Sequence, residues 1–368
     1  MQELNFGINA IGLTIPKYAL PLEELGASYF DNLGCKAMSL CGPDENVATL
    51  AITAAQRALA NWGGDLSRIG LIVVATETGL DMSRPLSSWV MDELGIKGFI
   101  RSYEVKHACY GGTVAVRQAL EWKLSGSSNG KAALVIAADV SMYAPGHSGE
   151  PTQGAGAIAM IIDQPLIATI NMHSYCWSES QFDFWRPVGN KYPEVNGRLS
   201  LTSYINAVIQ CFRQLAGPAE LASCLDTYQL MSFHVPFPKM VFKAVQHLGK
   251  YCNWSTEDTL KLYTQRILPT MQWNQQIGNN YTASLWFAVA NAVTKLAATE
   301  QFTAFSYGSG CGAELLTLEC TTNQANSAWA GELLKDFARR ETIDAQTYKE
   351  FRNSGLITKQ GIHHELTI

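Results

Sequence analysis

Apolar runs and amphipathic stretches alternate along the chain, and this alternation predicts strands separated by helices. Residues 69–76 (IGLIVVAT) and 132–138 are unbroken apolar runs, which are typical of strands buried on both faces of a sheet. Residues 47–62 instead place apolar side chains three and four positions apart and end at two glycines, so they predict a helix. Strands and helices alternate through residue 163, which predicts an α/β chain with a mainly parallel sheet.

The second part of the chain repeats this order of elements. Strands are predicted at residues 228–235 and 303–309, and helices at residues 203–215 and 283–298. We therefore expect two related α/β halves, residues 1–166 and 167–368, with ligands bound where strand ends from both halves meet. Further strands are expected at residues 5–15, 100–105, 153–162, 167–172 and 313–320, and further helices at residues 21–25, 87–94, 239–248 and 342–351.

Composition and charge narrow the class of protein. Apolar residues make up 47% of the 368 residues and charged residues 16%, so a large buried core is expected. The net charge is −5 and no Lys/Arg cluster occurs, so we expect no nucleic-acid partner. The N-terminus does not resemble a signal peptide and no apolar run has the length of a membrane span, so we expect no membrane association.

The nine cysteines are scattered at irregular spacings. None forms a CxxC pair and no His/Cys group has zinc-ligand spacing, so no metal site is expected. Scattered thiols suit a reducing compartment, and we expect a cytoplasmic protein.

One cysteine stands at the junction between a predicted strand and a predicted helix. Cys109 follows the strand at residues 100–105 and precedes a helical pattern that begins at Thr113. Free backbone N–H groups and the helix macrodipole at this position favour a thiolate, so we expect a lowered thiol pKa. Gly111 and Gly112 leave room for a bulky acyl group. We therefore expect a nucleophile; the alternative is a small buried residue at a turn, which is the usual role of a cysteine.

Two polar side chains at other predicted strand ends could act on the same reactant. Glu77 ends an apolar run, where desolvation raises a carboxyl pKa and yields a general base near neutral pH; the alternative is a capping or solvated carboxylate. His234 ends the strand at residues 228–235 and is a candidate proton donor or carbonyl polariser. The alternative for His234 is a structural histidine.

Two further features could contact a carbonyl group. Asn279 precedes the helix at residues 283–298 and could donate to a carbonyl oxygen or position His234, although a helix N-cap is equally compatible with its spacing. Residues 306–310 (SYGSG) form a glycine-rich loop that can bring backbone N–H groups close to a ligand. This loop is not a Walker or dinucleotide fingerprint.

Seven segments between residues 75 and 314 together identify a family resemblance. They are ATETGLD (75–81), YEVKHACYGGT (103–113), GEPTQGAGAIAM (149–160), DFWRPVGNKYP (183–193), SFHVPFPKM (232–240), IGNNYTASL (277–285) and FSYGSGCGAE (305–314). In these segments the chain resembles the hydroxymethylglutaryl-CoA synthases of the bacterial mevalonate-pathway type, within the thiolase-like superfamily. The resemblance implies a thiolase-like fold in which the two α/β halves pack as layered αβαβα.

The resemblance also implies an activity in isoprenoid precursor synthesis. Cys109 would take acetyl from acetyl-CoA, and Glu77 would remove a methyl proton from the acetyl-enzyme. The resulting carbanion equivalent would attack the ketone of acetoacetyl-CoA, whose oxygen His234 would contact, and water would then release hydroxymethylglutaryl-CoA. CoA thioesters are substrates in this scheme and no separate cofactor is implied.

Nine further positions match family residues around the substrates. Asn279 and Ser309 match residues near the acetoacetyl thioester, and the lysines match basic residues near the CoA phosphates; a solvated helix face is the alternative for the lysines. Thiolase-like enzymes usually pair through a central strand, so the resemblance implies a homodimer. The implied binding and supporting residues are Asp139, Tyr143, Thr152, Asp183, Ser200, Lys239, Lys243, Asn279 and Ser309.

The sequence is also compatible with two other functions. Residues 27–39 are shorter and less basic than the family pattern, and residues 311–313 are reminiscent of the polyketide β-branching synthases, which act on acyl-carrier-protein thioesters. The segments at 149–160 and 183–193 favour the CoA-using enzyme. A thiolase-like protein that only binds acyl-CoA or a partner is the third possibility, and the presence of Glu77, Cys109 and His234 argues against it.

Overall fold

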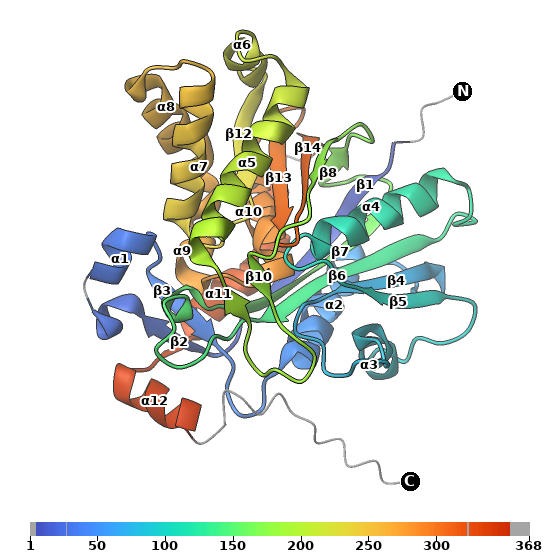
Figure 1. Ribbon diagram of the computed structural model, residues 1–368. Helices are drawn as coiled ribbons and strands as arrows, with labels where there is room; N and C mark the ends of the chain where they lie inside the picture. Colours follow the sequence, from blue (N-terminus) through green and yellow to red (C-terminus); the bar gives the residue numbers. More distant parts are fainter. Residues whose placement is uncertain (1–4, 27, 322–323, 354–368) are drawn as a thin grey trace.

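The computed structural model describes residues 5–26, 28–321 and 324–353, and its largest feature is one mixed sheet. The strands of this sheet are β1 (Gly7–Thr14), β4 (Ile69–Ala75), β5 (Arg101–Val105), β6 (Ala132–Val140), β7 (Ala155–Asp163), β8 (Ala168–Ile170), β9 (Tyr175–Ser178), β12 (Tyr228–Phe233), β13 (Gln301–Gly308) and β14 (Gly312–Cys320). Their order is β12-β13-β14-β8-β1-β7-β6-β4-β5, with β9 paired to β14 (Figure 1). Because β1 pairs with β8, the sheet passes from one predicted half to the other without a break.

Helices cover both outer faces and fill the space between the two parts of the sheet. The main helices are α2 (Val47–Trp62), α3 (Leu86–Glu93), α4 (Gly111–Leu124), α5 (Gly197–Leu215), α7 (Pro238–Tyr251) and α10 (Ser284–Val293). The shorter ones are α1 (Ser28–Leu33), α6 (Leu221–Leu225), α8 (Thr256–Leu262), α9 (Asn274–Ile277), α11 (Gly331–Arg339) and α12 (Ala345–Asn353). Short 3₁₀- or π-helical segments lie at Leu22–Leu25, Leu66–Arg68, Glu150–Thr152, Tyr263–Ile267, Leu268–Met271, Tyr281–Ala283 and Gln324–Ala330.

The described residues also form two small sheets. β2 (Tyr18–Pro21) pairs with β3 (Ala37–Leu40) and with β15 (Glu341–Thr342), and β10 (Phe184–Trp185) pairs with β11 (Glu194–Val195). Residues 28–40, most of which belong to the segment that is shorter and less basic than the family pattern, contribute α1 and β3.

The layers follow from the alternation of side chains along each strand. In β4, Leu71 and Val73 pack in the core that contains α4 and α10, whereas Ile72 and Val74 pack in the core that contains α2 and α3. A third core joins α5 and α7 to the opposite face of β12, β13 and β14 (Figure 1). The order is therefore helices, sheet, helices, sheet, helices, which confirms the predicted thiolase-like αβαβα arrangement.

The prediction of a mainly parallel sheet is wrong. Among the described strands of the large sheet, β4 pairs parallel to β5 and β6, and β12 pairs parallel to β13, while the other pairs are antiparallel. A parallel pair needs a long crossover, which α3 and α4 provide around β4. In contrast, β13 turns directly into β14, and no α-helix separates β6 from β7, so these pairs run in opposite directions.

Helix ends differ from the predictions where side chains supply caps. The helix predicted at 203–215 begins earlier, at Gly197, because the side chain of Asn196 accepts a hydrogen bond from Leu199 N at 3.1 Å. The helix predicted at 342–351 begins later, because Thr342 pairs in β15. The helix predicted at 47–62 has the expected bounds, with a capping box at Asn46.

In the described part of the chain, no helix combines the length and the apolar character that crossing a membrane would require. The division of the chain into two α/β halves, residues 1–166 and 167–368, is a proposal.

Candidate active site

Cys109 lies in a tight turn between β5 and α4. Ala108 adopts a left-handed conformation, with φ of +41°, which turns the chain sharply before the thiol. Gly308, at the end of β13, packs so closely on this turn that a Cβ atom there would collide with the backbone nitrogen of Tyr110. The end of a strand from the second half of the chain is thereby brought against the Cys109 turn.

The thiol of Cys109 and the carboxyl group of Glu77 form a pair. Cys109 Sγ donates a hydrogen bond to Glu77 Oε1 at 3.0 Å. Burial, together with the nearby charge of Asp139, raises the pKa of Glu77 to about 8, as its sequence position predicts. Burial and the charge of Glu77 also raise the pKa of Cys109 well above its ordinary value. The expectation of a lowered thiol pKa is therefore wrong, because burial and the carboxyl group 3.0 Å away outweigh the position of the thiol near a helix start.

Asp139 holds the Glu77 segment in place. Its buried carboxylate accepts hydrogen bonds from the backbone N–H groups of Glu77 (2.8 Å) and Thr78 (3.0 Å), and from the hydroxyl groups of Thr76 and Thr78. The other carboxylate oxygen accepts hydrogen bonds from the backbone N–H (3.0 Å) and the hydroxyl (2.6 Å) of Thr282, which belongs to the second half of the chain. Asp139 lies behind the site and fixes the backbone that carries Glu77.

Asp183 plays a similar part for the glycine-rich loop. Its buried carboxylate accepts hydrogen bonds from Ser309 Oγ at 2.8 Å, from Gly310 N at 3.3 Å and from Tyr307 Oη at 3.3 Å. The loop that the sequence predicts near a ligand is therefore held by an acid from residues 183–193, the segment that also contains β10.

His234 is buried at the end of β12, and burial lowers its pKa to about 3. Its backbone is anchored on both sides, because His234 N donates to Phe305 O at 2.7 Å and His234 O accepts from Tyr204 Oη at 2.7 Å. The ring atom Nδ1 has no hydrogen-bond partner among the described residues. The imidazole is therefore neutral at physiological pH.

A cavity of about 320 Å³ contains both Cys109 and His234; it is called the Cys109 cavity below. Its deep end is formed by buried side chains, including Asn279, whose backbone N–H donates to Thr152 O at 2.9 Å. Its mouth is formed by exposed residues such as Ser148 and Lys243. Six of the sequence-predicted binding residues line it, namely Tyr143, Thr152, Ser200, Lys243, Asn279 and Ser309.

The other three predicted binding residues lie outside this cavity. Asp139 and Asp183 make the supporting contacts described above. Lys239 is exposed on α7, one turn from Lys243, and is not part of the cavity wall.

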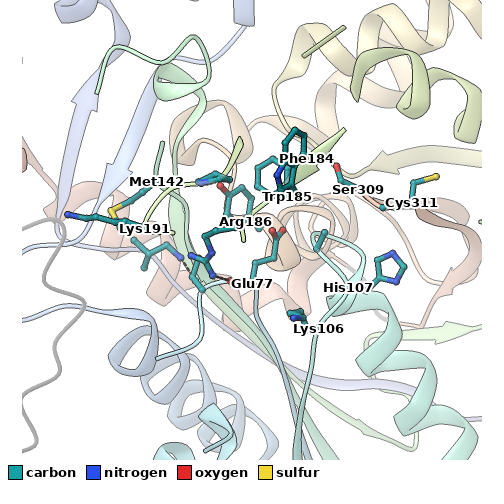
Figure 2. Close-up of a pocket in the computed structure, with 16 residues that line it drawn as sticks. Glu77, Lys106, His107, Met142, Phe184, Trp185, Arg186, Lys191, Ser309 and Cys311 are labelled. Carbon is teal, nitrogen blue, oxygen red and sulfur yellow. Dashed lines mark hydrogen bonds between the residues drawn. The ribbon is translucent and has the colours of Figure 1, made fainter. Parts of the chain in front are cut away.

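A second cavity, of about 430 Å³, lies on the other side of the thiol–carboxyl pair and is called the Glu77 cavity below. Figure 2 shows the Glu77 side chain surrounded by Trp185, Arg186, Lys106 and His107. Cys109 lines only the first cavity and Glu77 only the second, so the hydrogen-bonded pair stands between them.

Several residues at the site have no signal in the sequence pattern. Arg186 donates a hydrogen bond to Glu77 O, and its charge opposes the rise in the Glu77 pKa. Glu314 is buried beside the Cys109 turn, where it accepts from Tyr110 Oη at 2.6 Å and pairs with Arg117 at 3.2 Å. These contacts join residues more than a hundred positions apart.

The C-terminal helix α12 supports the wall of the Cys109 cavity. Arg352, which is buried, donates to Tyr143 O at 2.6 Å and to Gln153 Oε1 at 3.2 Å. Tyr348 Oη accepts from Gln153 Nε2 at 3.0 Å and donates to Glu150 Oε1 at 2.7 Å. The last described helix therefore fixes the loop that carries Tyr143 and Thr152.

Arg352→Met should lower the free energy of unfolding by about 2 kcal/mol, because it removes charge-assisted hydrogen bonds to buried acceptors. Urea denaturation measures this change. Lys349→Met, on an exposed position of the same helix, is the matched control and should change stability by less than about 0.5 kcal/mol. Equal stability of the Arg352 and Lys349 variants would show that α12 does not hold the loop.

The described residues contain no group of three or more His, Cys, Asp or Glu side chains arranged to hold a metal ion. The arrangement instead offers a thiol and a neutral imidazole that line one cavity, and a carboxyl group with a raised pKa that is hydrogen-bonded to the thiol. These are the groups needed for covalent acyl transfer followed by proton abstraction next to a thioester carbonyl.

Comparison with known proteins gives family models that match most of the chain. The model "Hydroxymethylglutaryl-coenzyme A synthase N terminal" matches residues 5–165, and the model "Hydroxymethylglutaryl-coenzyme A synthase C terminal" matches residues 169–259 and 248–354.

Individual relatives carry the same names. The chain is 32% identical over 336 residues to a hydroxymethylglutaryl-CoA synthase of Enterococcus faecalis, with 88% of this chain and 85% of that protein covered. The solved structure of MvaS in complex with 3-hydroxy-3-methylglutaryl coenzyme A matches with a TM-score of 0.85 and 32% identity, covering 95% of this chain and 92% of that one. The polyketide biosynthesis 3-hydroxy-3-methylglutaryl-ACP synthase PksG of Bacillus subtilis is 28% identical over 353 residues, with 91% of this chain and 84% of that protein covered.

Proposed function

Because the chain belongs to the hydroxymethylglutaryl-CoA synthase family, we propose that it condenses acetyl-CoA with acetoacetyl-CoA to form hydroxymethylglutaryl-CoA in the mevalonate pathway. The observation that carries this proposal is the 3.0 Å contact between Cys109 and Glu77 at the wall of a cavity that also contains His234. The substrates are CoA thioesters, and the scheme requires no separate cofactor.

In the first step Cys109 takes the acetyl group. The sulfur attacks the thioester carbonyl, Glu77 can take the thiol proton over the 3.0 Å contact, and CoA leaves with a proton. Backbone N–H groups at Cys109 and Ser309 would stabilise the oxyanion that forms during the attack.

In the second step the acetyl group becomes a nucleophile. The thioester acidifies the methyl protons, and Glu77 removes one of them as general base. The carbanion equivalent then adds to the ketone carbon of acetoacetyl-CoA. The carbon–oxygen π bond opens, and the resulting alkoxide takes the proton that Glu77 removed, so Glu77 returns to the carboxylate. His234 is neutral because burial lowers its pKa to about 3, so we assign it the role of polarising the ketone oxygen through a ring N–H rather than carrying a full charge.

In the third step water hydrolyses the thioester that still joins the product to Cys109. The carbonyl carbon gains the water oxygen, the carbon–sulfur bond breaks, and the carboxylate and the thiol are formed with release of one proton. Hydroxymethylglutaryl-CoA then leaves the cavity.

We propose that the CoA nucleotide lies at the mouth of the Cys109 cavity. Lys243 lines the cavity wall there, and Lys239 is exposed one turn away on the same helix, so both can approach the phosphates. Asn279 and Ser309 would contact the acetoacetyl thioester at the deep end, and Tyr143, Thr152 and Ser200 would contact the acyl chain.

The second candidate function is β-branching on an acyl carrier protein, which the similarity to PksG favours. Condensation rates measured with acetoacetyl-CoA and with acetoacetyl-carrier protein separate the two functions. We expect the protein to condense acetyl-CoA with acetoacetyl-CoA at least about tenfold faster than with acetoacetyl-carrier protein. Turnover of the carrier-linked acceptor alone would exclude the CoA function.

We also propose that the protein is a cytoplasmic homodimer. All nine cysteines are free thiols, which suits a reducing compartment, and cell fractionation tests this location.

The exposed edge of the large sheet is the proposed dimer contact. β5 is the last strand of the large sheet, and Phe99 beside it is fully exposed, so this edge is suited to pairing with a second copy. Light scattering tests it: a single-chain mass of 40.3 kDa in solution would exclude the dimer.

The condensation step should depend on pH through Glu77. The carboxyl pKa is raised to about 8, so the base is mostly protonated below that pH and mostly ionised above it. The rate of condensation by enzyme acetylated beforehand should therefore rise about tenfold per pH unit up to pH 8 and level off above it. Single-turnover measurements between pH 6 and about pH 9 test this prediction; a rate that falls as the pH rises would contradict the base assignment.

A further inference from the structure

The hydrogen-bonded pair of Cys109 and Glu77 lies between two cavities that are lined by different residues. The Cys109 cavity extends from the exposed Lys243 to the buried His234 and holds the thioester chain in the proposed function. The Glu77 cavity is closed toward Cys109 by the pair itself. Phe184, Tyr281 and Ser309 line both cavities and form the wall that the two share.

The hydrolysis step needs water at a moment when the Cys109 cavity is filled. The product remains joined to Cys109 through one thioester while its CoA portion still occupies the channel to solvent. A water molecule arriving along the same channel would have to pass the bound chain.

The Glu77 cavity provides a separate approach. Its rim is open and polar, because Lys106, Arg186 and Lys191 are exposed side chains on its wall. Figure 2 shows the Glu77 carboxyl group with Arg186 and Lys191 to its left and Lys106 below it. A water molecule bound to that carboxyl group lies within reach of the acyl carbon on Cys109, since the carboxyl oxygen and the sulfur are 3.0 Å apart.

We infer that the water that hydrolyses the acyl-Cys109 thioester enters through the Glu77 cavity and is activated there by Glu77. This inference rests on the proposed function. The water gives one proton to the Glu77 carboxylate, its oxygen bonds to the acyl carbon, and the carbon–sulfur bond breaks. The sulfur leaves as thiolate and recovers a proton from Glu77, so the pair returns to its starting state.

Occupying the Cys109 cavity tests the route in the unaltered protein. The acetyl-enzyme is formed with acetyl-CoA, separated from free CoA and incubated with or without saturating CoA that lacks its thiol group. Intact-protein mass spectrometry follows the loss of the acetyl group. We expect the two lifetimes to agree within about threefold, because the analogue does not enter the Glu77 cavity.

An acetyl lifetime more than about threefold longer in the presence of the analogue would show that water reaches the thioester through the Cys109 cavity. This result would overturn the inference. Inhibition of acetyl transfer by the same analogue verifies that the cavity is occupied. Failure of the acetyl group to attach to Cys109 at all would instead contradict the proposed function, so the two failures are distinguishable.

Filling the Glu77 cavity gives an independent test. Lys191→Trp adds bulk at the exposed rim, and Lys191→Gln is the matched variant that removes the charge without filling the space. The acetyl group should persist about tenfold longer in Lys191→Trp than in Lys191→Gln. Ser200→Trp fills the Cys109 cavity and should slow acetyl transfer without prolonging the lifetime. Equal lifetimes in the two Lys191 variants would overturn the inference.

Discussion

Cys109→Ala should abolish transfer of acetyl from acetyl-CoA to the protein and lower product formation by about 10⁴-fold or more, because no other group can replace the nucleophile. Cys109 is the only cysteine among the described residues that line the Cys109 cavity, and its sulfur contacts Glu77 at 3.0 Å. Intact-protein mass spectrometry measures the adduct, and a coupled assay of CoA release measures turnover.

Cys176→Ala is the matched control for this experiment. Cys176 is an exposed free thiol in β9 and lines neither of the two cavities. Its replacement should leave both readouts within about twofold of the unaltered protein. An acetyl adduct on the Cys109→Ala protein would show that the nucleophile is elsewhere.

Glu77→Gln should separate acetyl transfer from condensation. The substitution keeps the size of the side chain and its ability to accept the hydrogen bond from Cys109, but it removes the base. The charge of Glu77 is one of the causes that raise the thiol pKa, so its loss eases formation of the thiolate. The acetyl adduct should therefore still form, whereas condensation should fall by about 10²- to 10⁴-fold.

Enzyme acetylated beforehand and then mixed with acetoacetyl-CoA isolates the step that Glu77 is proposed to catalyse. Asp139→Asn is a useful comparison, because it disturbs the backbone that holds Glu77 without removing the base. The Asn variant should retain a pH dependence at a lower rate, but shifted below pH 8, because the charge of Asp139 no longer raises the Glu77 pKa. The Gln variant should lose this pH dependence. Product formation at the normal rate by Glu77→Gln would refute the base assignment.

The sequence was sufficient to predict the elements that carry the site. Apolar runs such as residues 69–76 and 132–138 predict β4 and β6, because a strand buried on both faces needs no polar side chains. The same run predicts a raised pKa for Glu77, since a carboxyl group at its end is desolvated whatever lies beside it. The strand-to-helix junction likewise gives the position of Cys109.

Properties that depend on distant partners could not be predicted in this way. The pKa of Cys109 is raised rather than lowered because the folded chain buries the thiol and because Glu77, from another part of the chain, lies beside it. Strand direction also depends on the connections, so the short turn between β13 and β14 makes that pair antiparallel. No periodicity marks Arg352 as a partner of Tyr143, because the contact joins positions about two hundred residues apart.

The most direct test of the account follows one protein molecule through two additions. The unaltered protein is mixed first with acetyl-CoA and then with acetoacetyl-CoA, and its intact mass and the soluble products are measured after each addition. We predict one acetyl group on Cys109 after the first addition, and its loss together with formation of hydroxymethylglutaryl-CoA after the second. Absence of the acetyl group, or an acetyl group that acetoacetyl-CoA does not remove, would contradict the claim that Cys109, Glu77 and His234 form one condensing site.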